Sequence, residues 1–399
     1  MKRLLILFAT LFWFSSSPGG EPGREYEEPY RDRLLYVHAF LNYELNAFWL
    51  YEWEQRFFSS NGFRLTVGSV TTTDLLGDGQ LALNPDLGGG WRFRGVGTWL
   101  ATRHLNVEEK STFMGLERHI FREFSIFLLT DPGYDKENTD ASLGVLAADK
   151  SREKYLSVAL VWDDFLYGEK NSRGGVSIRD PLAFQWFLRY GKDKWWVYSE
   201  GKLSTGFERS FPDQELSPRE QYHRQRIQHL AAKAYYRPAP STILASSFYY
   251  YRFDEAKNFY QAEYNYRYHN ALYGGSLDCI FPAGTRARFR ALSHYVRQEA
   301  GSSGFNSHDF RRGDLLAGVF YERLFASHSL DLGYMAAFFD WNYNGFAGQG
   351  DDRQSGYVDK LKLGWSYAFA KSARIHISIS HQVNVGGFGG ANLQYLMFF

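Results

Sequence analysis

The chain has 399 residues, and its 45 Lys and Arg nearly balance 44 Asp and Glu, so a net charge of +1 gives no sign of a nucleic-acid partner. Aromatic residues make up 18% of the chain, yet the mean hydropathy of −0.41 excludes a bundle of membrane-spanning helices. A single cysteine, Cys279, excludes an intramolecular disulfide.

Residues 1–20 have the pattern of a secretory signal peptide. Lys2 and Arg3 precede an apolar run from Leu4 to Phe14, and small residues follow it. This run is too short to span a bilayer, so we expect export rather than anchoring. We expect residues 21–42, which are charged and contain proline, to form a short periplasmic N-terminal lead.

From residue 43 onward, apolar and polar residues alternate in segments of about 10–15 residues. In 371–383, for example, Ile375, Ile377 and Ile379 alternate with His376 and Ser378. Soluble sandwiches use strands of about 5–6 residues, whereas a transmembrane strand needs about 9–11 tilted residues flanked by aromatic girdles. Because backbone groups inside a bilayer must all be paired, such a sheet has to close.

The pattern predicts an all-β fold: a transmembrane antiparallel up-and-down β-barrel over residues 43–399, with 16–18 strands and 18 preferred. Long and short connections should alternate, but their phase breaks before residue 284, which indicates a miscounted strand within 254–282. The predicted strands are 43–58, 61–73, 90–105, 117–131, 139–151, 153–165, 181–193, 194–209, 226–238, 241–253, 257–269, 270–281, 284–298, 311–324, 326–343, 354–370, 371–384 and 388–399.

The last segment places Leu393, Tyr395, Met397 and Phe399 on one face. An exported chain of alternating strands that ends in an aromatic residue resembles Gram-negative outer-membrane β-barrel proteins of the porin-like kind. The resemblance implies location in the outer membrane, among its lipids. It also implies that these four residues are the signal read by the barrel assembly machinery.

The polar faces of the predicted strands carry the candidate functional residues. Arg286, Arg288 and Arg290 would form a ladder of cations about 6.6–7 Å apart on one strand face. Facing charges in a lumen set ion or solute preference, so we expect a channel for small polar or charged solutes; a lumen wall of mutually paired charges without selectivity is the alternative. The other predicted pore-lining residues are Lys360, Lys362, Arg92, Arg94, Glu52, Glu54, Glu263 and Arg267.

Catalytic and cofactor motifs give weaker signals. The neighbours Ser293 and His294 should point to opposite faces of a strand, as should Ser380 and His381, so neither pair can hydrogen-bond as nucleophile and base. In DLLGDGQLALNPD, Leu76 occupies a position where a calcium loop needs an oxygen ligand. No C-x-x-C-H motif is present. We therefore expect no enzyme activity, no cofactor and no metal site.

Two other functions fit the same barrel. It could sheathe a periplasmic or extracellular partner in its lumen, such as a multihaem cytochrome of an electron conduit, or it could serve as an export port for a polysaccharide. The long charged stretches 165–181 and 210–226 are candidates for a loop that narrows the lumen.

Overall fold

The computed structural model describes residues 61–69, 75–102, 107–131, 140–149, 154–162, 176–179, 182–192, 194–210, 220–239, 241–304, 307–344 and 352–399. The predicted signal peptide, the lead, the predicted strand 43–58, Glu52 and Glu54 lie outside these ranges. No helix in the described part of the chain is long and apolar enough to cross a membrane.

An antiparallel barrel of 18 strands closes on itself, as predicted. Each strand pairs with its neighbour along the chain, and β1 pairs both with β2 and, through Gly62↔Phe398 and the following register, with β21. The barrel strands are β1 (Gly62–Ser69), β2 (Leu75–Leu83), β4 (Trp91–Thr102), β5 (Val107–Phe121), β6 (Phe124–Asp131), β7 (Asp140–Ala148), β8 (Lys154–Trp162), β10 (Leu182–Lys192), β11 (Trp195–Ser204), β13 (Glu220–Ala239), β14 (Thr242–Phe259), β15 (Tyr266–Pro282), β16 (Ala287–Gly304), β17 (His308–Leu324), β18 (His328–Asn344), β19 (Asp352–Ala370), β20 (Ala373–Gln382) and β21 (Phe388–Phe398).

Three short strands lie outside this closed ring. They are β3 (Asp86–Gly88), β9 (Val176–Arg179) and β12 (Phe207–Ser210). β3 pairs with β4 in the β2–β4 connection, and β12 pairs with both β9 and β13. β9 and β12 extend the wall at the end of the barrel that carries the long connections.

The outer face of the barrel is apolar. Leu277, Leu128 and Leu363 are 63%, 59% and 56% exposed, and many other large apolar side chains share their face. Exposed apolar surface of this extent is unfavourable in water but matches the hydrocarbon of a bilayer. The closed pairing and this exterior together identify a membrane-spanning β-barrel.

The connections at the two ends of the barrel differ in length. One end has short turns such as 122–123, 240–241 and 371–372, whereas the other has the long connections 163–181 and 205–219. The amide of Phe399 donates to the carbonyl of Asn61 at 3.0 Å, which places both ends of the strand ring at the short-turn end. Most connections at this end are shorter than those at the other end, so the predicted break in phase disappears; the clearest exceptions are 84–90 at the short-turn end, with seven residues, and 305–307 at the other end, with three.

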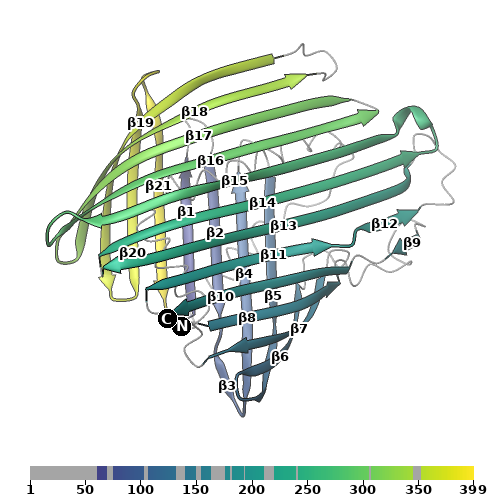
Figure 1. Ribbon diagram of the computed structural model, residues 1–399, viewed down its shortest axis with the longest axis horizontal. Coiled ribbons are helices and arrows are strands. Elements are labelled where there is room, and N and C mark those ends of the chain that lie inside the picture. The colour runs from purple at the N-terminus through teal and green to yellow at the C-terminus, as the bar shows by residue number, and fades with distance from the viewer. Residues whose placement is uncertain are drawn as a thin grey trace.

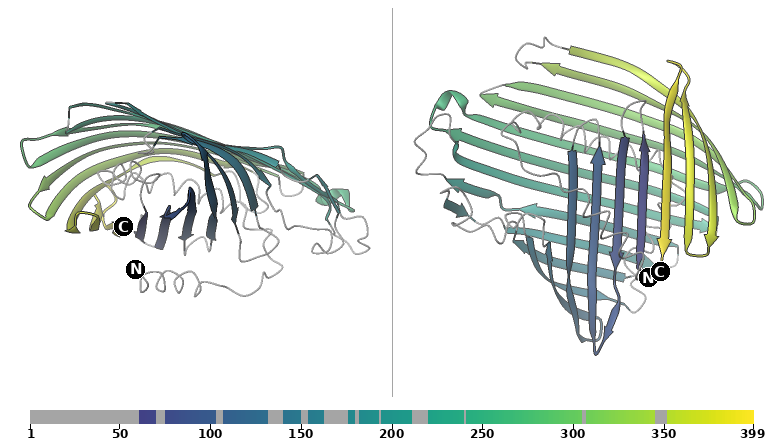
Figure 2. Two further views of the ribbon diagram at one scale, coloured as in Figure 1. Left: turned by 90° about the horizontal axis from the view of Figure 1, so that it is seen from below. Right: turned by 180° about the vertical axis from the view of Figure 1, so that it is seen from behind.

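The wall is taller on one side than on the other. β13 has 20 residues and β19 has 19, whereas β6 has only eight and β7 and β8 have nine each. In Figure 1, β13 to β19 run across the front while β1, β2, β4 and β5 lie behind them at a steep angle. Both views in Figure 2 show the same two walls.

The predicted count of 18 is confirmed, but two of the predicted segments are not single strands. Residues 257–269 are not one strand, because β14 ends at Phe259 and a 3-10 helix, η3 (Ala262–Tyr264), turns the chain into β15. The predicted strand 117–131 is divided by a turn in which Arg122 has φ of 50°.

The prediction also missed β2. Gly77 and Gly79 replace apolar residues on its outer face, and the ring of Trp99 from β4 covers them instead. A Cβ at Gly77 would overlap that ring. The apolar surface that the alternation rule looks for is therefore supplied by the neighbouring strand.

Candidate functional site

The inward face of the barrel is polar and mostly buried. His294, His376 and Gln298 are fully buried, although each lies at an inward position of its strand. An apolar cluster on this face joins Leu396 and Phe398 of β21 to residues of β15 to β18, including Phe320 and Met335. These inward side chains are therefore packed by the chain itself, whereas others, such as Lys202 and Lys233, are only half-buried.

Paired charges line the inward face of β15 to β17. Arg290 donates from Nε and Nη2 to both carboxylate oxygens of Asp278, at 2.6 to 2.9 Å, while its guanidinium lies 5.5 Å from the ring centre of Phe320. Arg288 pairs with Glu322, and Arg312 donates to Asp314 at 2.8 Å. These buried pairs hold cations and acids in alternation, so neither sign dominates this part of the wall.

A second inward group connects β18, β19 and β20. The Nδ1 atom of His376 lies 2.9 Å from Oγ of Ser366 and 3.6 Å from Oδ1 of Asp331. Lys362, which is also buried, interacts electrostatically with Asp331. A hydrolytic triad needs the serine and the carboxylate on different ring nitrogens. Here both face Nδ1, so the three residues do not have that geometry.

Arg94 of β4 reaches across several strands. Its Nη2 donates to the hydroxyl of Tyr155 on β8 at 2.5 Å, and its guanidinium lies 4.7 Å from the ring centre of Phe127 on β6. Its Nε lies 3.9 Å from the carboxylate of Glu117. One cation therefore ties together the sharply curved wall formed by β4 to β8.

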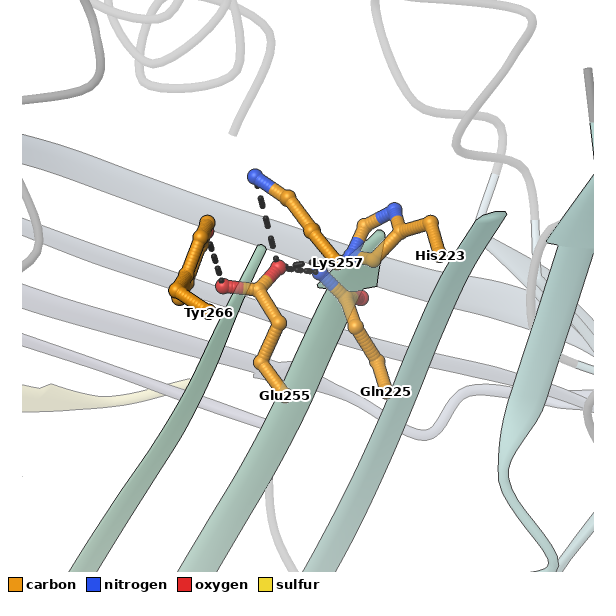
Figure 3. A network of polar contacts seen from close by, with 5 residues as sticks. All are labelled: His223, Gln225, Glu255, Lys257 and Tyr266. Atoms are coloured by element: carbon orange, nitrogen blue, oxygen red, sulfur yellow. Dashed lines mark hydrogen bonds and ion pairs between the residues drawn. The ribbon is translucent and has the colours of Figure 1, made fainter. Parts of the chain in front are cut away.

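Glu255 is the centre of an inward polar network on β13, β14 and β15 (Figure 3). Its Oε1 accepts from Gln225 at 2.9 Å, lies 2.6 Å from Nε2 of His223 and lies 3.6 Å from Nζ of Lys257. Its Oε2 accepts from the hydroxyl of Tyr266 at 3.0 Å. The network combines three strands at the long-connection end of the tall wall.

Taken together, the described inward side chains include more Arg and Lys than Asp and Glu. Inward positions follow from the alternation of each strand and its register with the buried residues. The cations are Arg64, Arg92, Arg94, Arg189, Lys202, Lys233, Arg237, Lys257, Arg288, Arg290, Arg312, Lys360, Lys362 and Arg374; the acids are Asp78, Glu117, Asp131, Asp140, Glu200, Glu255, Asp278, Asp314, Glu322 and Asp331.

Six of the predicted pore-lining residues lie on the inward face, namely Arg288, Arg290, Lys360, Lys362, Arg92 and Arg94. The remaining three described ones lie elsewhere.

Arg286 does not belong to the predicted ladder of three arginines, because it is exposed in the turn before β16. Glu263 is exposed in η3, because the segment that contains it turns between two strands. Arg267 is an exposed residue of β15 on the outer face, between Ala256 and Ser303 of the neighbouring strands.

The serine–histidine neighbours are separated as predicted. Ser293 is exposed on the outer face while His294 is buried inside, and His381 is exposed while Ser380 is buried. The proposed assembly residues Leu393, Tyr395 and Met397 lie on the outer face of β21, and Phe399 follows its last residue and is exposed. Their recognition by the assembly machinery stays a prediction.

Sequence reasoning missed most inward acids. Asp278 and Asp331 lie within otherwise apolar or small-residue stretches and Glu322 lies between Tyr321 and Arg323, and the partners of all three come from neighbouring strands. Only the register brings them together: Arg288 faces Glu322, which in turn faces Asp331. No spacing within a single strand reveals such a row.

No family model and no curated protein matches the chain. Solved structures with a similar barrel include OmpT, an outer-membrane protein of Vibrio cholerae, at 8% identity and a TM-score of 0.39, covering 85% of this chain and 96% of that one. The outer-membrane channel DcaP of Acinetobacter baumannii has 12% identity and a TM-score of 0.37, covering 85% and 96%. OccK5 of Pseudomonas aeruginosa has 12% identity and a TM-score of 0.37, covering 85% and 97%. At these values the likeness adds nothing to the barrel that the strand pairing already shows.

Proposed function

We propose that the protein is an outer-membrane channel that passes small polar or charged solutes through a charge-lined lumen. The observation that carries the proposal is a closed 18-strand ring with an apolar exterior and charged side chains on its inward face. Barrels of 16–18 strands are wide enough for an aqueous channel. The short-turn end, where the strand ring begins and ends, would face the periplasm.

The balance of inward charge supports a preference for anions. Among the described side chains, Arg and Lys outnumber Asp and Glu on the inward face, although many of them form pairs such as Arg290–Asp278. Paired charges present little net field to a passing ion, whereas surplus cations attract anions and replace part of their hydration. The preference is therefore expected to be modest.

The packing of the inward face favours a small solute over an inserted protein. A sleeve around a multihaem cytochrome needs an inner surface that is free to contact its partner. Here His294, Gln298 and His376 are already covered within the single chain. An export port for an extended polysaccharide needs less room and is the stronger of the two alternatives.

The first test is the conductance of the refolded full-length chain in a planar bilayer, with the reversal potential measured in a salt gradient. A stable conductance with modest anion preference is expected. Lys360→Gln removes an inward cation and should move the reversal potential toward cation preference. Arg353→Gln removes an exposed outer cation of the same strand and should leave it unchanged. An inserted barrel that never conducts would overturn the channel and favour the export port.

A further inference from the structure

A group of arginines lies on the outer face of β13, β14 and β15, toward the long-connection end. We call it the arginine shelf and define it as Arg224, Arg226, Arg252, Arg267 and His269. In each strand these residues occupy the same alternate positions as the apolar side chains that contact lipid nearer the short-turn end. The shelf is therefore part of the exterior and not of the lumen.

The register brings the shelf residues close to one another. Arg224 and Arg267 both face Ala256, from opposite sides. In the adjacent row of the outer face, two residues along each strand, Arg226 faces Asp254, which faces His269. Adjacent strands are about 4.8 Å apart, so two arginines flank a single small residue at about twice that spacing.

The shelf lies beyond the part of the wall needed to cross a bilayer. β13, β14 and β15 have 20, 18 and 17 residues, whereas about 9–11 tilted residues span the hydrocarbon. On β14 the outer face changes from Leu244 and Phe248, both exposed and apolar, to Arg252 within four residues. This change marks the level at which lipid tails give way to headgroups.

Local acids do not neutralise the shelf. Arg252 holds Asp254 in a bidentate pair at 2.8 to 3.1 Å, and Arg224 lies 3.4 Å from Glu208 with its side chain about half exposed, so the second pair is weak in water. Among the described residues, Arg226 and Arg267 have no acidic partner within ion-pair distance. Asp254 and Glu208 thus offset two of the four arginines, and Glu299, which faces Ala271 in the row of Arg252, is paired with Arg297.

The type of cation indicates the type of ligand. On this half of the outer face of β13 to β19, each described Arg or Lys is an arginine; besides the shelf, these are Arg297, Arg311 and Arg353. A guanidinium binds a phosphate oxygen pair in bidentate geometry, which an ammonium cannot do. The small side chain of Ala256 leaves room between Arg224 and Arg267 for a headgroup to approach.

We propose that the arginine shelf binds the phosphorylated headgroup of a lipid in the leaflet at the long-connection end. The lipid tails would lie against the apolar residues of β14 and β15, and the phosphate would lie over Ala256, between Arg224 and Arg267 and beside Arg226. This interaction requires the barrel to be in a membrane and is independent of whether its lumen conducts.

The test uses the full-length barrel in phosphatidylcholine nanodiscs that contain phosphatidic acid, a phosphomonoester lipid. The lipids retained after transfer to mild detergent are counted by native mass spectrometry. The shelf variant is Arg224→Gln with Arg226→Gln and Arg267→Gln. The matched control is Arg297→Gln with Arg311→Gln and Arg353→Gln, which changes the same charge on β16, β17 and β19.

The unaltered barrel should retain phosphatidic acid in preference to phosphatidylcholine. The shelf variant should lose at least about tenfold of that preference, which corresponds to about 1.4 kcal/mol, while the control keeps it. Free inorganic phosphate should not displace the lipid. Equal retention by the shelf variant, an equal loss in the control, or displacement by inorganic phosphate would each overturn the proposal.

If the shelf variant fails to fold, the corresponding Arg→Lys variant keeps the charge and removes only bidentate geometry. It should lose part of the preference. Full retention in that variant would show that lipid charge alone, and not a phosphate site, accounts for the binding.

Discussion

Removing the carboxylate of Asp278 tests whether inward charge pairs stabilise the barrel. Arg290 has a side chain that is only 4% exposed, and it makes its three short contacts with Asp278. Asp278→Ala leaves that guanidinium buried without its acid. Breaking a buried pair in this way costs about 3–5 kcal/mol. The double variant with Arg290→Met should recover much of the loss, because no unpaired charge then remains inside.

The neighbouring pair Arg297–Glu299 supplies the control. It lies on the outer face of the same strand as Arg290, with an N–O distance of 2.7 Å and side chains 43% and 41% exposed. Glu299→Ala should therefore cost about 0–1 kcal/mol. The free energy of unfolding is measured in phospholipid vesicles from tryptophan fluorescence against urea. If Asp278→Ala costs no more than Glu299→Ala, the inward pairs are not structural and the reasoning is wrong.

Three further substitutions separate packing from assembly. Gly115→Ala should reduce stability by at least about 1–3 kcal/mol in the same urea assay, because its Cβ would overlap a backbone oxygen of the paired strand. Gly313→Ala should be nearly neutral, because no atom lies within 4 Å of the added Cβ. Phe398→Ala should cost about 3–5 kcal/mol, because that ring belongs to the inward apolar cluster. Phe399→Ser, at a ring that is 43% exposed, should leave the refolded barrel stable but lower the folded fraction in cell membranes, measured by heat-dependent gel migration; a normal folded fraction would exclude its role in assembly.

The barrel was predictable because period-2 alternation is long and repeated. The predicted strand count was right only because two extra predicted strands offset two strands that the prediction missed. The extra predicted strands are 43–58, which lies outside the described residues, and 257–269, where an alternating tyrosine pattern continues through a turn. The prediction missed β2 and merged part of β5 with β6. Alternation detects exposed apolar faces and cannot detect a glycine face covered by Trp99.

The candidate site was harder to predict because it depends on register. The sequence correctly places Arg288 and Arg290 on one face, but Asp278 and Glu322, which neutralise them, come from adjacent strands. We predicted that Arg267 faces the lumen because the predicted strand 257–269 placed it on the polar face. That strand does not exist, and Arg267 belongs to the outer face of β15. A shift of one residue reverses the face of a whole strand, so each boundary error also reverses the assignment of its charges.

The unequal height of the wall has a consequence for the surrounding bilayer. The eight residues of β6 in the described chain are about 26 Å long and, at the usual tilt, cover about 20 Å of depth, less than the apolar band of about 25 Å around such barrels. Lipids beside β6 to β8 must therefore compress or tilt to match it, at a cost of fractions of a kcal/mol per ångström. Beside β13 to β19 no such adjustment is needed. The barrel would thus impose a local thickness gradient on its membrane, with the thinnest lipid annulus beside β6 to β8, which only β10 and β11 separate from the arginine shelf.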